Sequence, residues 1–355
     1  MLKKSKFKKI ISTSIMTLML AGTIDSGILG MRQVYVYAAE STQVQTVLKK
    51  SVSLEDVIQR TCKAVLENHY SMDWAAIGLD RAGNRHMIPA DYLQKVEEYL
   101  KDPKNQSLFE SRPTEYERIT LGVLAAGGDP TNVNGSGINL IEKIYNADLE
   151  SQGINALVFG LIALDAKGYE IPEDATWNRE KLVNAILDKQ CDDGGWAFFG
   201  SNGDPDMTGM AMTALAPYKK GKKVLELDNA KVNSAVNEAV EFLSDMQNAT
   251  GGFESWGTVN SESCAQVIMG LCTNGIDAGK DKKFVKNGRS VVDALLSFEV
   301  EGGGFAHIND ERFGGVNGMA TEQALYALDQ YKLYLDTKGQ GSIYDWSTYP
   351  SSVIK

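Results

Sequence analysis

The chain has 355 residues, a formal net charge of -10, 43% hydrophobic residues and 23% charged residues. This composition is typical of a globular chain that is long enough to bury a large core. An acidic surface repels nucleic acid and anionic lipid, so we expect neither of them as a partner.

The first 38 residues have the pattern of a secretory signal. Lysines cluster before residue 10, and an apolar run interrupted by serine and threonine extends from Ile10 to Ile24. The run is shorter than the roughly 20 apolar residues that cross a bilayer, and a small-x-small cleavage pattern ends at Ala38. We therefore predict a cleaved signal peptide at 1–38, an N-terminal segment at 39–52, and a secreted or cell-surface protein with no membrane span after cleavage.

From residue 53 to residue 338 the chain alternates two kinds of predicted helix. Six segments are apolar nearly all round or have a broad apolar face, which predicts burial on more than one side. These inner helices are expected at 73–82, 115–126, 155–166, 206–218, 262–273 and 320–335. A more polar helix with a one-sided apolar stripe precedes each of them. These outer helices are expected at 54–67, 92–100, 138–145, around 182–187, 232–246 and 290–298.

Glycine and proline follow several of the predicted helices, at the positions where helices commonly end. Strand patterns are hard to find, so the chain is predicted to be all-α. Twelve helices in six hairpins form either an open solenoid or a closed ring. Burial of the inner helices on several sides favours closure into an α6/α6 toroid over 53–338, in which outer helices surround inner ones. A C-terminal tail follows at 339–355.

A turn motif recurs three times in the second half of the chain. Two glycines precede an aromatic residue at Trp196, Phe253 and Phe305, at intervals of about 50 to 60 residues. A repeat of this length indicates stacked supersecondary units, each of which buries its apolar face against a neighbour.

The stretch DPDMTGMAMTALAPY follows the turn at Trp196, and NSESCAQVI follows the turn at Phe253. Together with the repeated turn, these stretches resemble the prenyltransferase and squalene-cyclase repeat family, in particular its exported single-barrel bacterial members. The resemblance covers the chain after the signal segment and implies an α/α toroid. It leaves the function open, because this superfamily includes terpene cyclases, zinc prenyltransferases, thioester proteins and corrinoid carriers.

Asp204 and Asp206 lie where the DxDDT motif of class II terpene cyclases falls by this resemblance. Asp206 stands at the place of the proton donor, which must stay protonated while neighbouring acids orient it. Met207 replaces the third acid of the motif. The alternative is that Asp204 or Asp206 caps a helix by accepting hydrogen bonds from backbone N–H groups. For Asp206 we expect the capping role.

Glu262 and Cys264 fall where the zinc prenyltransferases have an Asp-x-Cys pair, but Ala320 stands at the position of their histidine. A catalytic zinc site needs three ligands of suitable type. The chain also lacks the Cys-Gly-x-x-Gln arrangement of the thioester proteins at Cys191 and the second β domain of the corrinoid carriers. We therefore predict no metal and no cofactor.

Aromatic and polar residues gather at the turn end of the predicted toroid. We expect them to line an axial cavity in which stacking and a few polar contacts hold a ligand. The candidate binding residues are Trp74, Tyr116, Asn155, Trp196, Phe199, Trp256, Glu262, Phe305 and His307. For Trp196, Phe253 and Phe305 we favour the alternative that they fill gaps between neighbouring hairpins.

These observations predict an exported toroid that binds an apolar, isoprenoid-like or corrinoid-like small molecule, or a surface protein. The alternative is a terpene cyclase or prenyltransferase-like enzyme that acts on a polyprenyl substrate, with Asp206 as its acid.

Overall fold

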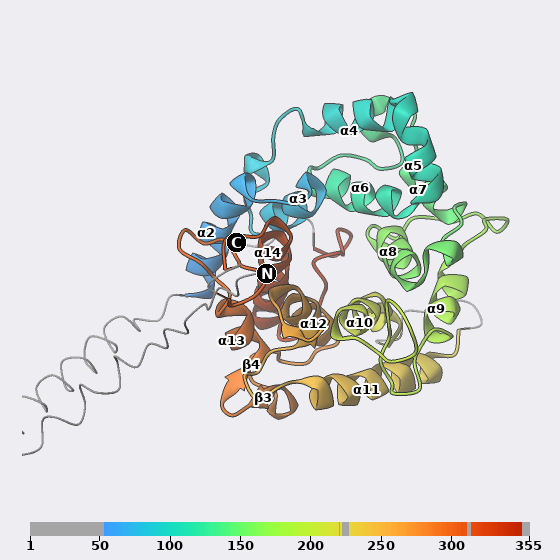
Figure 1. Ribbon diagram of the computed structural model, residues 1–355. Helices are drawn as coiled ribbons and strands as arrows, with labels where there is room; N and C mark the ends of the chain where they lie inside the picture. Colours follow the sequence, from blue (N-terminus) through green and yellow to red (C-terminus); the bar gives the residue numbers. More distant parts are fainter. Residues whose placement is uncertain (1–52, 220, 222–226, 311–313, 350–355) are drawn as a thin grey trace, which may run out of the picture. The chain divides into compact units, whose positions relative to one another are not determined.

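The computed structural model describes residues 53–219, 221, 227–310 and 314–349 (Figure 1). This part of the chain is mostly helical, as the sequence predicts. Its strands form two short antiparallel pairs, β1 (Glu254–Ser255) with β2 (Thr258–Val259) and β3 (Val285–Lys286) with β4 (Arg289–Ser290). The predicted signal peptide at 1–38 and the segment at 39–52 lie outside the described residues.

Six helices are buried on most sides, and their bounds agree with the predicted inner helices to within a few residues. They are α3 (Met72–Arg81), α6 (Thr114–Ala125), α8 (Ile154–Asp165), α10 (Pro205–Lys219), α12 (Ser261–Thr273) and α14 (Gly318–Thr337). In α8, every residue from Ala156 to Leu164 is buried, because this helix offers apolar side chains in all directions.

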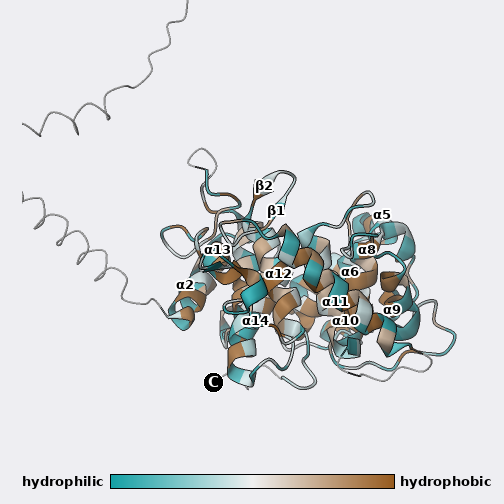
Figure 2. Cartoon of the chain, turned by 90° about the horizontal axis from the view of Figure 1, so that it is seen from below, coloured by the Kyte–Doolittle hydropathy of each residue, from teal (hydrophilic) through white to brown (hydrophobic). Residues whose placement is uncertain are grey.

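A helix buried mainly on one side precedes each inner helix. These outer helices are α2 (Leu54–Glu67), α4 (Tyr92–Lys101), α7 (Leu140–Tyr145), α9 (Arg179–Leu187), α11 (Asn229–Met246) and α13 (Val291–Leu296). In α11, Val232, Val236 and Leu243 are buried, and Figure 2 shows hydrophilic residues elsewhere on this helix.

Short helical turns in the connections were not predicted from the sequence. They are α5 (Gln106–Ser111) and the 3-10 helices η1 (Arg85–Met87), η2 (Pro103–Asn105), η3 (Val133–Gly135), η4 (Glu150–Gln152) and η5 (Lys282–Phe284).

The inner helices pack against one another in chain order. Each of α3, α6, α8, α10 and α12 contacts the next inner helix, and α14 contacts both α3 and α2 at the start of the domain. The contacts therefore form a closed cycle, and their sequence can be followed along the helices of Figure 1.

Glycines bring α10 and α12 into close contact. A Cβ atom added at Gly209 would lie 2.3 Å from the carbonyl oxygen of Gln266, and one added at Gly270 would lie 2.9 Å from Gly209. The two backbones can approach this closely only because neither position carries a side chain.

Residues 339–349, which belong to the tail predicted from the sequence, pack against the C-terminal ends of the inner helices. The backbone N–H of Trp346 donates to the Ala166 carbonyl at 2.8 Å, and its indole N–H donates to Asp80 at 2.9 Å. Ile343, Tyr344 and Trp346 are buried. This segment therefore covers one end of the helix assembly.

Candidate functional site

Two adjoining cavities lie where the inner helices begin. The larger, which we call the rim cavity, has a volume of about 720 Å³, and the smaller, the inner chamber, has a volume of about 230 Å³. Both are lined by Asn155, Met210, Met319 and Gln323. Of the candidate residues, Asp204, Asp206, Asn155, Phe199, Trp256 and Glu262 line the rim cavity, and Trp74 and Asn155 line the inner chamber.

Asp204 caps α10. Its carboxylate accepts a hydrogen bond from the backbone N–H of Met207 at 2.7 Å and another from that of Phe198 at 2.8 Å. Pro205 follows as the first helical residue, where its missing N–H costs nothing. Asp204 therefore fixes the start of α10 and the loop before it.

Asp206 does not have the capping role that we expected for it. Its side chain turns toward the next hairpin and accepts hydrogen bonds from Ser255 Oγ and, at 3.1 Å, from Ser263 Oγ. The expectation is wrong because the residue before the first helical position, Asp204, already caps the helix. Burial raises the pKa of Asp206 to about 6, the two serines oppose the shift, and Asp204 adds to it.

Glu262, at the start of α12, forms a pair with His307. Nδ1 of His307 lies 2.7 Å from Oε2 of Glu262, and the imidazole is about half exposed. Burial raises the pKa of the Glu262 carboxyl, and the hydrogen bond from His307 opposes this shift. The pair places an ionisable group beside the rim cavity.

Large aromatic side chains at the rim cavity face solvent. Trp256 is 88% exposed, Phe199 71% and Phe198 50%. The rings of Phe198 and Phe199 meet edge to face with their centroids 4.4 Å apart. Contiguous exposed apolar side chains on a soluble chain commonly mark an interaction site.

Trp256 occupies an unusual backbone position. It lies with Gly257 between β1 and β2, in a two-residue hairpin loop, and its φ is 58°. A left-handed conformation is uncommon for a bulky residue, and hairpin loops of this kind favour asparagine, aspartate or glycine there. The hairpin therefore holds the indole in solvent at some conformational cost.

Trp196 and Phe305 are fully buried and line neither cavity. The indole N–H of Trp196 donates to the carbonyl of Ile186 in α9 at 2.7 Å, and Phe253, the third member of the repeat, is also fully buried. We therefore assign these aromatic residues to the core between hairpins rather than to the binding set. Tyr116 also lies away from both cavities, stacked on Phe109 with centroids 5.0 Å apart.

The inner chamber contains Glu322, which the sequence suggested as a polar contact for a ligand, and three polar residues that the sequence did not single out for binding. Glu117 and Arg118 lie on α6, and Tyr326 lies on α14. Glu322 of α14 accepts hydrogen bonds from the backbone N–H groups of Tyr70 and Ser71, both at 3.1 Å. The sequence gives no distinct signal for Glu117, because Glu115 and Arg118 accompany it in the polar first half of α6.

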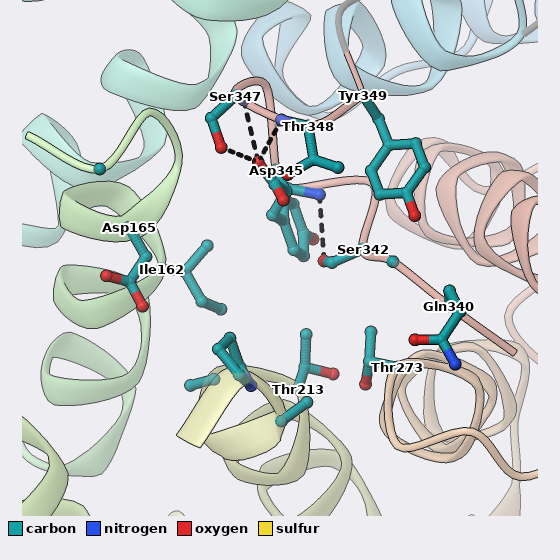
Figure 3. Close-up of a pocket in the computed structure, with 16 residues that line it drawn as sticks. Ile162, Asp165, Thr213, Thr273, Gln340, Ser342, Asp345, Ser347, Thr348 and Tyr349 are labelled. Carbon is teal, nitrogen blue, oxygen red and sulfur yellow. Dashed lines mark hydrogen bonds between the residues drawn. The ribbon is translucent and has the colours of Figure 1, made fainter. Parts of the chain in front are cut away.

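A third cavity, of about 490 Å³, lies at the other ends of the inner helices, under the C-terminal segment. Figure 3 shows residues of that segment on one side and residues of α8, α10 and α12 on the other. Asp165 accepts hydrogen bonds from Arg179 and Tyr218, and Asp345 accepts them within its own loop from Ser347 and Thr348. None of the residues that line this cavity is among the exposed large apolar side chains of the described residues, whereas Phe198, Phe199 and Trp256 at the rim cavity are. This cavity is therefore a weaker candidate than the rim cavity.

Within the described ranges, no three His, Cys, Asp or Glu side chains are grouped as a metal site requires, and the absence of a metal stays a prediction. None of the described helices combines the length and apolar character needed to cross a membrane. Comparison with known protein families and with curated proteins finds no match for this chain. The resemblance to the prenyltransferase and squalene-cyclase repeat family therefore stays an expectation.

Proposed function

We propose that the protein is an exported α6/α6 toroid of the prenyltransferase and squalene-cyclase repeat type, which binds an apolar or ring-containing small molecule in the rim cavity. The closed cycle of inner-helix contacts and the outer helix before each inner one support the toroid. Phe198, Phe199, Trp256 and several methionines give the rim cavity an apolar part, and isoprenoid-like and corrinoid-like molecules are ligand classes that fit such a lining. A surface protein that inserts an apolar side chain is the other partner consistent with the rim.

Trp256 is the observation that carries the proposal. A left-handed backbone at a bulky residue costs about 1 to 3 kcal/mol, and this residue gains little burial in return because it is 88% exposed. Such a cost is retained where it serves a function. The indole, Phe198 and Phe199 line the same cavity, so a bound apolar molecule would bury several aromatic rings together.

The test is the Trp256→Ala variant, with farnesol and cobinamide as probes in calorimetric titrations. Loss of one aromatic contact removes about 1 to 3 kcal/mol of binding free energy, so Kd should rise by about 5-fold to 150-fold. The free energy of unfolding should change by less than about 0.5 kcal/mol, because the side chain is exposed. Tyr145→Ala, on the outer helix α7, is the control and should leave Kd unchanged. If neither probe binds the unmodified protein, the proposal fails.

A second candidate, an acid-catalysed cyclase, is favoured by the position of Asp206. Its carboxyl bonds two serine hydroxyls, not the start of its own helix, and lines the rim cavity. A carboxyl whose pKa is raised to about 6 is protonated in part near neutral pH, as a general acid must be.

Incubation with squalene and with geranylgeranyl diphosphate, followed by chromatography of the products, tests this candidate. A cyclised product that disappears with Asp206→Asn would establish the acid role. If no product forms and farnesol still binds, the binding function remains and the enzymatic one is excluded for these substrates.

A further inference from the structure

Glu117 is a buried acid whose carboxyl group has no hydrogen-bond partner in the part of the chain that the structure describes. It lies on α6, lines the inner chamber and is only 1% exposed. Neither carboxyl oxygen has a hydrogen-bond partner among the described residues. Buried polar groups are nearly always hydrogen-bonded, because desolvation without a partner is costly. The position of Glu117 therefore indicates that a hydrogen-bond donor is supplied from outside the chain.

The other charged groups around the chamber have partners. Arg118 bonds Asp73, Glu115 and Ser71 through its guanidinium. One carboxylate oxygen of Glu322 accepts hydrogen bonds from the backbone N–H groups of Tyr70 and Ser71, which follow α2. Among the described residues, Arg118 is the one cationic side chain that lines the chamber, and it already bonds two acids. Three acids line the chamber, namely Glu115, Glu117 and Glu322.

Aromatic rings form the apolar wall of the chamber. Trp74 meets Phe159 edge to face with centroids 5.2 Å apart, and it lies 6.3 Å from the ring of Tyr326. The faces of such rings attract cations, and the attraction is larger where water is excluded. A volume of about 230 Å³ suits a small ring or a short alkyl chain that bears one polar group.

We propose that the inner chamber binds the protonated amine of a small molecule, with Glu117 as the counter-ion and with Trp74 and Phe159 against its apolar part. The inference rests on the proposed function, since it assigns a second subsite to the same end of the helix assembly. Asn155 and Met210 line both cavities, so one ligand can place its amine in the chamber and an apolar group at the rim.

Binding of an amine moves a proton. Burial raises the pKa of Glu117 well above its ordinary value, which favours the neutral acid in the free chamber. An ammonium group beside it stabilises the carboxylate, and the acid's proton leaves to the buffer. Besides Glu117, the ionisable groups that line the chamber are Glu115 and Arg118 on α6, Glu322 and Tyr326 on α14, and Tyr70 before α3. Asp73 on α3 does not line the chamber but bonds Arg118. The two residues of α8 that line the chamber, Asn155 and Phe159, have no ionisable side chain.

The experiment titrates the full chain with phenethylamine, 2-phenylethanol and 3-phenylpropionate at pH 7. These probes share a ring and differ in the charge of the polar end. We expect phenethylamine to bind at least tenfold more tightly than the alcohol and the anion not to bind. Titration in phosphate and in Tris, whose ionisation enthalpies differ, should reveal that protons are released when the amine binds.

Glu117→Gln keeps the shape of the side chain but cannot form a carboxylate. The variant should therefore bind phenethylamine at least tenfold more weakly and release no proton on binding. Glu98→Gln, on the outer helix α4, is the matched control and should change neither. If Glu117→Gln does not fold, the ranking of the three probes and the proton count on the unmodified protein decide the question.

Three results would overturn the proposal: equal binding of amine and alcohol, unchanged amine binding by a folded Glu117→Gln variant, or preference for 3-phenylpropionate. The last result would assign the chamber to an anion held by Arg118. Farnesol binding that depends on Trp256 would survive all three, so failure of this inference and failure of the proposed function can be told apart.

Discussion

Asp204 and Asp206 are two positions apart and have different environments. Asp204 bonds the backbone of its own helix start, whereas Asp206 bonds Ser255 and Ser263 of the following hairpin. The first arrangement stabilises a carboxylate through N–H donors. The second places a carboxyl in a partly buried position beside another acid, which favours the neutral form.

This difference predicts a pH dependence of stability at Asp206. Its folded-state pKa of about 6 exceeds the ordinary value of about 3.9, so the folded state binds a proton that the unfolded state has lost. The stabilising contribution is fully present below about pH 4 and is lost as the pH rises through 6. Relative to the unmodified protein, Asp206→Asn should therefore gain about 1 to 3 kcal/mol of stability between pH 4 and pH 7.

Urea unfolding at a series of pH values measures this gain. Asp174→Asn, in an exposed loop, is the control and should show a constant difference from the unmodified protein. A constant difference for Asp206→Asn as well would show that its carboxyl is ionised throughout this range.

At the scale of elements, the packing of α10 on α12 depends on small residues that face each other. Gly209 and Gly270 leave no side chain between the backbones, and this contact brings the capped start of α10 to the serines that bond Asp206. The geometry of the rim cavity is therefore set by helix packing as well as by its lining residues.

Gly209→Ala should separate the two helices. The added Cβ would lie 2.3 Å from a backbone oxygen that cannot rotate away, and overpacking of this kind typically costs about 1 to 3 kcal/mol. Chemical denaturation measures the loss. Gly315→Ala, where a Cβ meets nothing within 4 Å, should change stability by less than about 0.5 kcal/mol. If Gly209→Ala left the free energy of unfolding unchanged, the helices would have to lie further apart in solution.

The C-terminal segment is a second element whose position depends on distant contacts. Trp346 bonds Asp80 and Ala166, and the Arg81 guanidinium lies 4.1 Å from the centre of its ring. Trp346→Ala removes a buried aromatic side chain, a change that commonly costs about 3 to 5 kcal/mol. Hydrogen exchange should then show loss of protection over residues 339–349. Protection equal to that of the unmodified protein would mean that Trp346 does not hold the segment in place.

At the scale of the whole molecule, the chain closes on itself through contacts between its first and last helices. α14 packs against α2 and α3, and Arg60 of α2 bonds both carboxylate oxygens of Glu299, one of them at 2.7 Å. In an open array each repeat contacts only its neighbours, so the ends can unfold separately. A closed cycle gives every inner helix two neighbours.

Closure predicts that residues 54–349 unfold in one cooperative transition. Far-ultraviolet circular dichroism reports helix content, and tryptophan fluorescence reports mainly the packing around the buried and partly buried Trp74, Trp177, Trp196 and Trp346. The two denaturation curves should coincide, as they do for a two-state protein. An early fluorescence transition at constant helix content would indicate that α2 and α3 detach from α14 first, contrary to this prediction.

The inner helices and the repeated turn could be predicted from the sequence because their signals are local. A segment such as α8 is apolar in every direction, and the glycines at helix ends depend only on backbone conformation. The short α5 and the 3-10 turns were not predicted, because one or two helical turns are too short to show a periodic pattern in the sequence.

The candidate site depended on tertiary structure, because burial and hydrogen bonding join residues far apart in the sequence. Trp196 and Trp256 both follow or lie within turns, yet one fills the core and the other faces solvent. Asp204 caps the helix and Asp206 does not, because Ser255 and Ser263 of the next hairpin donate hydrogen bonds to Asp206. The sequence by itself thus determined the helices and their order, since these follow from short-range periodicity. Only the packed structure decided which buried side chains, such as Glu117, have no hydrogen-bond partner among the described residues, because such partners come from segments far apart in the sequence.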